Sequence, residues 1–228
     1  TYFSIQHLLS SAFICKQLIE FETNLGTDSS DEQLINHRSF VVSVIMSSVS
    51  FLEATINELF MDSAENPNGN IKDLNKSVVK MFAKMWKKGI PRTASYTILE
   101  KYQIALTLAN KKEFDLGTSL LQNVTVLIKL RNALVHYEPE SVVTKSLFEG
   151  TAIKQQKLEQ QLKGKFKINP YTCVDNPFFP DKCLSLGCAL WSLKSTVDFT
   201  DSFFLELGII PTYQKIKFKI TDILKHSH

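Results

Sequence analysis

Two side chains near the middle of the chain have the types and spacing that suit chemistry at a phosphate group. In the stretch LIKLRNALVHYEPE, residues 127–140, Arg131 and His136 are five residues apart. A guanidinium group offers a planar fork of N–H donors that fits a phosphate. An imidazole titrates near neutral pH and can act as a general acid or base. The pair is therefore a candidate site for proton transfer beside a developing negative charge.

Arginine is a rare choice of base in this chain. Lysine and arginine together number 26, and only Arg38, Arg92 and Arg131 are arginine. The net charge of +3 is too small to indicate nucleic-acid binding by itself. Because lysine is the usual base in this chain, a position that has arginine is a candidate for binding a phosphate or carboxylate through the planar guanidinium fork.

The segment from Thr118 to about residue 138 has the periodicity of a helix, and Arg131 lies within its apolar side. On a helical wheel the apolar arc is centred near Arg131 and contains Leu120, Val124, Ile128, Leu130, Leu134 and Val135. A charge among packed apolar side chains is costly unless it is paired. One interpretation is an ion pair with Glu53 on a neighbouring helix, with Asn57 one turn later. The other is that Arg131 faces a cleft or a subunit interface and binds a phosphate.

His136 is expected in the last turn of this helix, because Pro139 disfavours helical geometry at Glu138. The carbonyl end of a helix favours an imidazolium there by about 0.3–1 kcal/mol, so His136 could serve as a terminator alone. Asn132 and His136 share the polar edge of the helix. Arg131 and His136 are separated by about 140° around an ideal helix. Joint action therefore requires a distorted helix end or a second copy of the chain.

The segment RNALVH, at the end of an apolar helix in an all-α chain, resembles the Rx4–6H motif of the HEPN superfamily, often written RNxxxH. The segments FLEATINELF, LEKYQIAL and CALWSLKSTVDF extend the resemblance over roughly residues 40–208. The family consists of α-helical domains that are typically dimeric, and many are metal-independent endoribonucleases. The resemblance implies a HEPN-like bundle, RNA as substrate, a homodimer, no metal and no cofactor. It also implies a place in bacterial defence or a toxin–antitoxin system, with an antitoxin or a regulatory partner.

By position, the resemblance makes Arg131 and His136 the catalytic pair and Asn132 the polar residue beside them. A base would accept the proton of the ribose 2′-hydroxyl, and a cation would stabilise the charge on the phosphorane. In a related toxin–antitoxin group, a tyrosine two places after the histidine is modified by its antitoxin. Here Tyr137 follows His136 directly and Glu138 stands two places after it, which argues against that antitoxin class. The alternative is a non-catalytic dimerisation module that binds RNA, a nucleotide or a protein.

A second basic segment, KMFAKMWKKG, places four lysines at near-helical spacing beside Trp86: Lys80, Lys84, Lys87 and Lys88. Such an arrangement suits a groove for the phosphate backbone with an aromatic ring for stacking. A solvated helix face accounts for the same pattern, and both interpretations stay open.

The rest of the sequence predicts one all-helical bundle over residues 1–228. Helices are expected at about 2–22, 32–64, 71–88, 94–110 and 118–138, in part of 141–164, and from residue 181 or 185 to Gly208. An irregular insertion is expected around 165–180, and KIKFKI could be a short strand or a helix start. Cys183 and Cys188 are expected in the core. Reduced thiols and the absence of an apolar run long enough for a bilayer favour a cytoplasmic protein without membrane contact.

Overall fold

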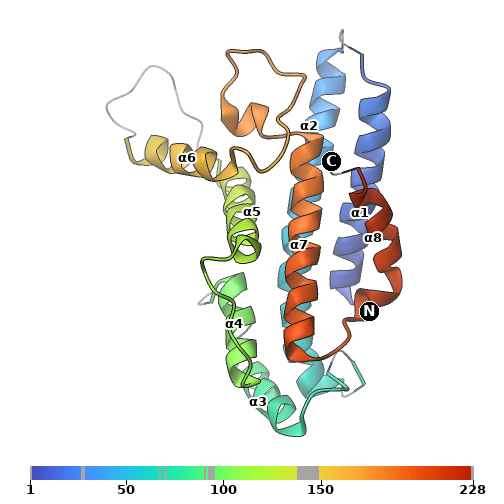
Figure 1. The fold of residues 1–228 in the computed structure, drawn as a ribbon, viewed down its shortest axis with the longest axis vertical. Helices are drawn as coiled ribbons and strands as arrows, with labels where there is room; N and C mark the ends of the chain where they lie inside the picture. Colours follow the sequence, from blue (N-terminus) through green and yellow to red (C-terminus); the bar gives the residue numbers. More distant parts are fainter. Residues whose placement is uncertain are drawn as a thin grey trace.

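The computed structural model describes residues 2–26, 29–66, 68–69, 71–89, 91, 96–137 and 149–226. In these residues the chain is an all-helical bundle and contains no strand, as the sequence predicts (Figure 1). Three long helices lie side by side at its centre: α1 (Phe3–Thr23), α2 (Asp31–Glu65) and α7 (Leu186–Leu207). The helices α4 (Ile98–Leu108) and α5 (Ser119–Val135) lie one beyond the other along the same side of α7 (Figure 1).

The remaining helices cover the ends and the outer side of this bundle. Helix α3 (Lys76–Lys87) packs against the end of α2, and α6 (Glu149–Leu162) follows at the other end beside α5 (Figure 1). Helix α8 (Lys217–Leu224) lies against α1 and is preceded by the 3-10 helix η3 (Thr212–Ile216). The segment KIKFKI is therefore helical.

Side-chain caps fix where the helices begin. Thr118 accepts a hydrogen bond from the Leu121 N–H, and Ser185 accepts one from the Cys188 N–H at 3.0 Å, so α5 and α7 begin at the expected residues. Thr97 and Glu100 form a capping box at the start of α4. That box explains why α4 starts later than the predicted residue 94. Helix α7 ends at Gly208, whose φ of 75° lies in the left-handed region that favours glycine.

The expected irregular insertion lies between α6 and α7. It contains the short π-helical turn η2 (Phe178–Lys182) and is attached to the bundle by several polar contacts. The buried His37 imidazole lies 2.7 Å from the Glu22 carboxylate and packs against the ring of Tyr171. Arg38 forms a 3.1 Å ion pair with Asp181. These contacts hold the insertion against the ends of α1 and α2.

Helix α2 is long and apolar enough to cross a membrane by length and composition, which corrects the expectation that the chain has no such run. Half of its most apolar 18-residue window is buried inside the bundle, and core helices of soluble proteins meet the same criterion. The fully buried side chains of α2 include Val41, Val44, Ile45, Phe51 and Leu52. In this structure the apolar side of α2 therefore packs against the other helices.

The cysteines are all free, and three are buried, including Cys183 and Cys188 as predicted. Burial raises the pKa of the Cys15 and Cys183 thiols to about 12 and that of Cys188 well above its usual range. A thiol with so high a pKa holds its proton at neutral pH and is a poor nucleophile. These three side chains therefore serve packing.

Candidate functional site

Arg131 lies near the end of α5, on the side of the helix that faces the bundle. The same side carries the buried Val124, Leu127 and Leu130, and the Arg131 side chain is half-buried. Its Nε atom is buried and has no hydrogen-bond partner among the described residues. Buried polar groups in proteins nearly always form a hydrogen bond, so an acceptor is expected for this N–H group. The wheel prediction that Arg131 sits within the apolar side is confirmed.

Glu53 is not the partner of Arg131, which corrects the first interpretation of that arginine. The Glu53 carboxylate lies 3.5 Å from the Lys101 ammonium, and Asn57 accepts a hydrogen bond of 3.2 Å from the same group. Lys101 is buried and therefore requires the compensation that these two side chains provide. Both residues join α2 to α4 and have no hydrogen bond to Arg131.

His136 ends α5 on the solvent side. It is the C-cap residue, with φ of −107° and ψ of 47°, and its backbone N–H donates to the Asn132 carbonyl at 2.9 Å. The side chains of His136 and Asn132 are both exposed, as their shared polar edge predicts. Glu138 and Pro139, on which the predicted helix end rests, lie outside the described residues.

The end of α5 also presents apolar surface next to His136. Val135 is 52% exposed and Tyr137 is 47% exposed. The Tyr137 ring lies 6.1 Å from the ring of Phe179, so the end of α5 contacts the irregular insertion. Arg131 lies on the bundle side of α5, whereas His136 is exposed at its end. The expectation that joint action requires a distorted helix end or a second copy of the chain stays a prediction.

The lysines of α3 lie far from this pair within one chain. Lys80, Lys84, Lys87 and Lys88 are exposed, and α3 packs against α2 and α4 at the opposite end of the bundle from α6 (Figure 1). The indole N–H of Trp86 donates to Glu65 at 3.0 Å. These lysines therefore do not share a site with Arg131 in one protomer.

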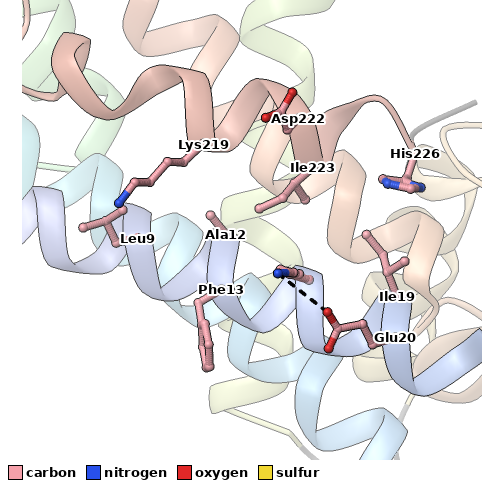
Figure 2. Close-up of a pocket in the computed structure, with 10 residues that line it drawn as sticks. Leu9, Ala12, Phe13, Ile19, Glu20, Lys219, Asp222, Ile223 and His226 are labelled. Atoms are coloured by element: carbon pink, nitrogen blue, oxygen red, sulfur yellow. Dashed lines mark ion pairs between the residues drawn. The ribbon is translucent and has the colours of Figure 1, made fainter.

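Two cavities lie elsewhere, and no motif in the sequence indicates either of them. One of about 720 Å³ lies between α1 and α8 (Figure 2). Its walls include Ala12 and Ile223, with an ion pair of 3.7 Å between Lys16 and Glu20 on α1. The other, of about 560 Å³, lies where the insertion meets the start of α7. Arg131 and His136 line neither cavity.

The described residues contain no group of three or more His, Cys, Asp or Glu side chains placed to hold a metal ion. The chemically distinctive feature of α5 is thus a half-buried guanidinium followed by an exposed amide and imidazole. No protein family, curated protein or solved structure matches this chain.

Proposed function

We propose that the chain is a metal-independent endoribonuclease of the HEPN type that works as a dimer through Arg131 and His136. The observation that carries the proposal is the buried Nε of Arg131, which has no acceptor among the described residues. A guanidinium in that position is stabilised by an anion that arrives from outside the chain. The phosphate of a bound RNA strand is such an anion, and the His136 side chain at the end of the same helix is exposed to solvent, where RNA can reach it.

The proposed chemistry uses two histidines, one from each chain. One neutral imidazole accepts the proton of a ribose 2′-hydroxyl, and the 2′-oxygen forms a bond to the adjacent phosphorus. The bond from phosphorus to the 5′-oxygen breaks, and the leaving oxygen takes a proton from the second, protonated imidazole. Arg131 donates hydrogen bonds to the phosphorane oxygens as their charge grows. Asn132 orients the histidine or the phosphate. The products are a 2′,3′-cyclic phosphate and a 5′-hydroxyl.

Two observations support a dimer that joins at the end of α5. First, Arg131 and His136 lie on different sides of α5, and a second chain can supply the partner group that each lacks. Second, the side chains of Val135 and Tyr137, on either side of His136, expose apolar surface to water in the single chain. Pairing the two α5 ends would bury these side chains and gather both arginines and both histidines.

A second function is favoured by the same divergence of Arg131 and His136 within one chain. If two chains do not join at α5, the exposed His136 and the half-buried Arg131 act separately. The chain would then be a HEPN-like module that binds RNA, a nucleotide or a protein without cleaving it. Binding of RNA without cleavage identifies this case.

We place the proposed enzyme in bacterial defence or a toxin–antitoxin system on the strength of the HEPN resemblance alone. The partner in that setting is an antitoxin or a regulator that restrains cleavage. The free cysteines suit a reducing compartment, which supports a cytoplasmic location.

The experiment that tests the proposal is cleavage of RNA by the purified protein in EDTA, with mapping of both product ends. A 2′,3′-cyclic phosphate and a 5′-hydroxyl are expected, and EDTA should not change the rate. Products with a 3′-hydroxyl would contradict attack by the 2′-oxygen. If wild-type protein cleaves no RNA under any activating condition while its effect in cells persists, the enzyme proposal is wrong.

A further inference from the structure

The cavity at the start of α7 has the size and lining of a small-molecule site. Its volume of about 560 Å³ lies within the range of about 300–1,000 Å³ that is usual for ligand pockets. We call it the Trp191 pocket, and its lining includes Lys165, Phe166, Lys167, Gly187, Trp191 and Lys194. None of its lining residues belongs to α5, so the pocket is separate from Arg131 and His136.

The wall that the insertion contributes is fixed to α7 by close backbone contact. The Ser185 hydroxyl donates a 2.6 Å hydrogen bond to the Lys167 carbonyl and accepts one from the Cys188 N–H. A Cβ atom at Gly187 would lie 2.7 Å from the same Lys167 carbonyl oxygen, closer than real side chains allow. Glycine therefore permits this approach, and the pocket is already formed without a ligand.

Two aromatic rings lie together in the pocket. The ring centres of Phe166 and Trp191 are 5.3 Å apart, with the planes inclined at 46°. Among the described residues the indole N–H of Trp191 makes no hydrogen bond, whereas that of Trp86 donates to Glu65. A flat apolar surface with an available donor suits a heteroaromatic base, which can stack and accept a hydrogen bond.

The charged lining has an excess of cations. Three lysines stand against one carboxylate, Glu22, which is engaged by His37 at 2.7 Å. Lys165 donates to the neutral side chain of Asn123. Lys194 pairs with Asp198 on the surface of α7, and an exposed pair of this kind contributes little and exchanges readily. Lys167 also has a contact of its own within the chain. The three ammonium groups outnumber the one carboxylate of the lining, so an anion that enters the pocket is attracted.

We propose that the Trp191 pocket binds one nucleotide unit, with the base against Trp191 and Phe166 and the phosphate beside Lys167 and Lys194. The unit can belong to a free nucleotide or to a single-stranded RNA. The inference stands on the cavity, the rings and the lysines, and it does not rest on cleavage at Arg131 and His136.

The test measures tryptophan fluorescence of the full chain as ATP or a short oligoadenylate is added. Trp86→Phe leaves Trp191 as the only tryptophan in the chain, so quenching reports the pocket. The double variant Lys167→Gln/Lys194→Gln should weaken binding about tenfold or more, because charge-assisted hydrogen bonds to phosphate are lost. The matched control Lys111→Gln/Lys112→Gln removes the same charge from the exposed segment between α4 and α5 and should bind as before. A rise in melting temperature with ligand gives a second measure of binding.

Quenching by ATP supports a free nucleotide as the ligand, and quenching by the oligoadenylate alone supports a strand. The inference is overturned if neither ligand changes the emission or the melting temperature. It is also overturned if the control pair weakens binding as much as the pocket pair, or if inorganic tripolyphosphate binds as tightly as ATP. The titration in His136→Ala should give the same affinity, which separates this result from the outcome of the cleavage assay.

Discussion

The buried ammonium of Lys101 lies 3.5 Å from the Glu53 carboxylate and 3.2 Å from the Asn57 amide oxygen. This contact joins α4 to α2 and compensates a lysine that is only 4% exposed. It also means that Glu53 is engaged away from Arg131. The stabilising ion pair between α2 and its neighbours and the candidate site at the end of α5 are therefore separate features.

Glu53→Gln should lower the free energy of unfolding by about 1–3 kcal/mol, because it leaves the Lys101 charge buried with weaker compensation. The rate of RNA cleavage per folded molecule should stay the same. Urea unfolding measures the change in stability, and an RNA cleavage assay measures the rate. The control Asp175→Asn removes an exposed carboxylate and should change neither. Unchanged stability in Glu53→Gln would contradict a stabilising role of the pair between Glu53 and Lys101. Loss of RNA cleavage in a folded Glu53→Gln variant would mean that Glu53 acts at the Arg131 site.

Glu58 should make stability depend on pH. Its carboxylate accepts hydrogen bonds from the Ser4 backbone N–H and hydroxyl, so it caps α1 from the neighbouring α2. Burial raises the pKa of Glu58 above its usual 4.5, although the Ser4 hydrogen bonds oppose that shift. The folded state thus favours protonated Glu58. The stability that this preference contributes is present below pH 4.5 and is lost as pH rises through the pKa of Glu58 in the folded state.

Glu58→Gln keeps an acceptor for Ser4 and removes the titration. The fall in unfolding free energy as pH rises above 4.5 should therefore be shallower in this variant than in wild type. Urea unfolding over a pH series measures the slope, and the exposed Glu32→Gln should keep the wild-type slope. A slope in Glu58→Gln equal to that of wild type would show that Glu58 does not titrate differently on folding.

Val135→Lys should convert the proposed dimer to monomers and lower RNA cleavage with it. The side chain is already 52% exposed, so the substitution is tolerated in the single chain but places two charges at the proposed contact between α5 ends. Analytical ultracentrifugation measures the mass of the variant in solution, and urea unfolding measures its stability. Ile35→Lys, at an exposed apolar residue of α2, is the matched control. A dimer that persists in Val135→Lys would place the contact elsewhere.

Arg131→Lys should keep a positive charge but lower the cleavage rate by about 100-fold or more, in the range found when a transition-state donor is removed. An ammonium is a point charge and cannot bind two phosphate oxygens through a planar fork. Single-turnover rates at saturating RNA measure the effect. Arg38→Lys, which alters an ion pair with Asp181, should cleave normally. Equal rates for Arg131→Lys and wild type would mean that charge alone suffices.

The helices and the starts of α5 and α7 were predictable because they depend on local signals. Helix α3 was expected from about residue 71 but begins at Lys76, where the Asn75 side chain caps it by accepting from the Ser77 N–H. Thr118 and Ser185 cap α5 and α7 as expected, and the helical wheel placed Arg131 on the packed side and His136 in solvent. The start of α4 was set too early because the capping box of Thr97 and Glu100 outweighs the helical pattern before it. These features follow from neighbours in sequence.

Contacts between helices were not predictable in the same way. The partner of Glu53 is Lys101, and nothing in the segment LEKYQIAL indicates that the packing of α4 on α2 buries this lysine. The segment KMFAKMWKKG combines lysines with aromatic side chains, but its helix α3 lies at the end of the bundle opposite the insertion (Figure 1). The Trp191 pocket joins residues 165–167 to residues 187–194 through a close backbone contact that no spacing reveals.

The most direct test of the Arg131 and His136 proposal is the single-turnover RNA cleavage rate of His136→Ala beside wild type. The proposal predicts a loss of about 100-fold or more, the scale of general acid–base catalysis. His136 is exposed, so the melting temperature and the dimer mass should stay unchanged. A folded, dimeric His136→Ala protein that cleaves RNA as fast as wild type would contradict the account.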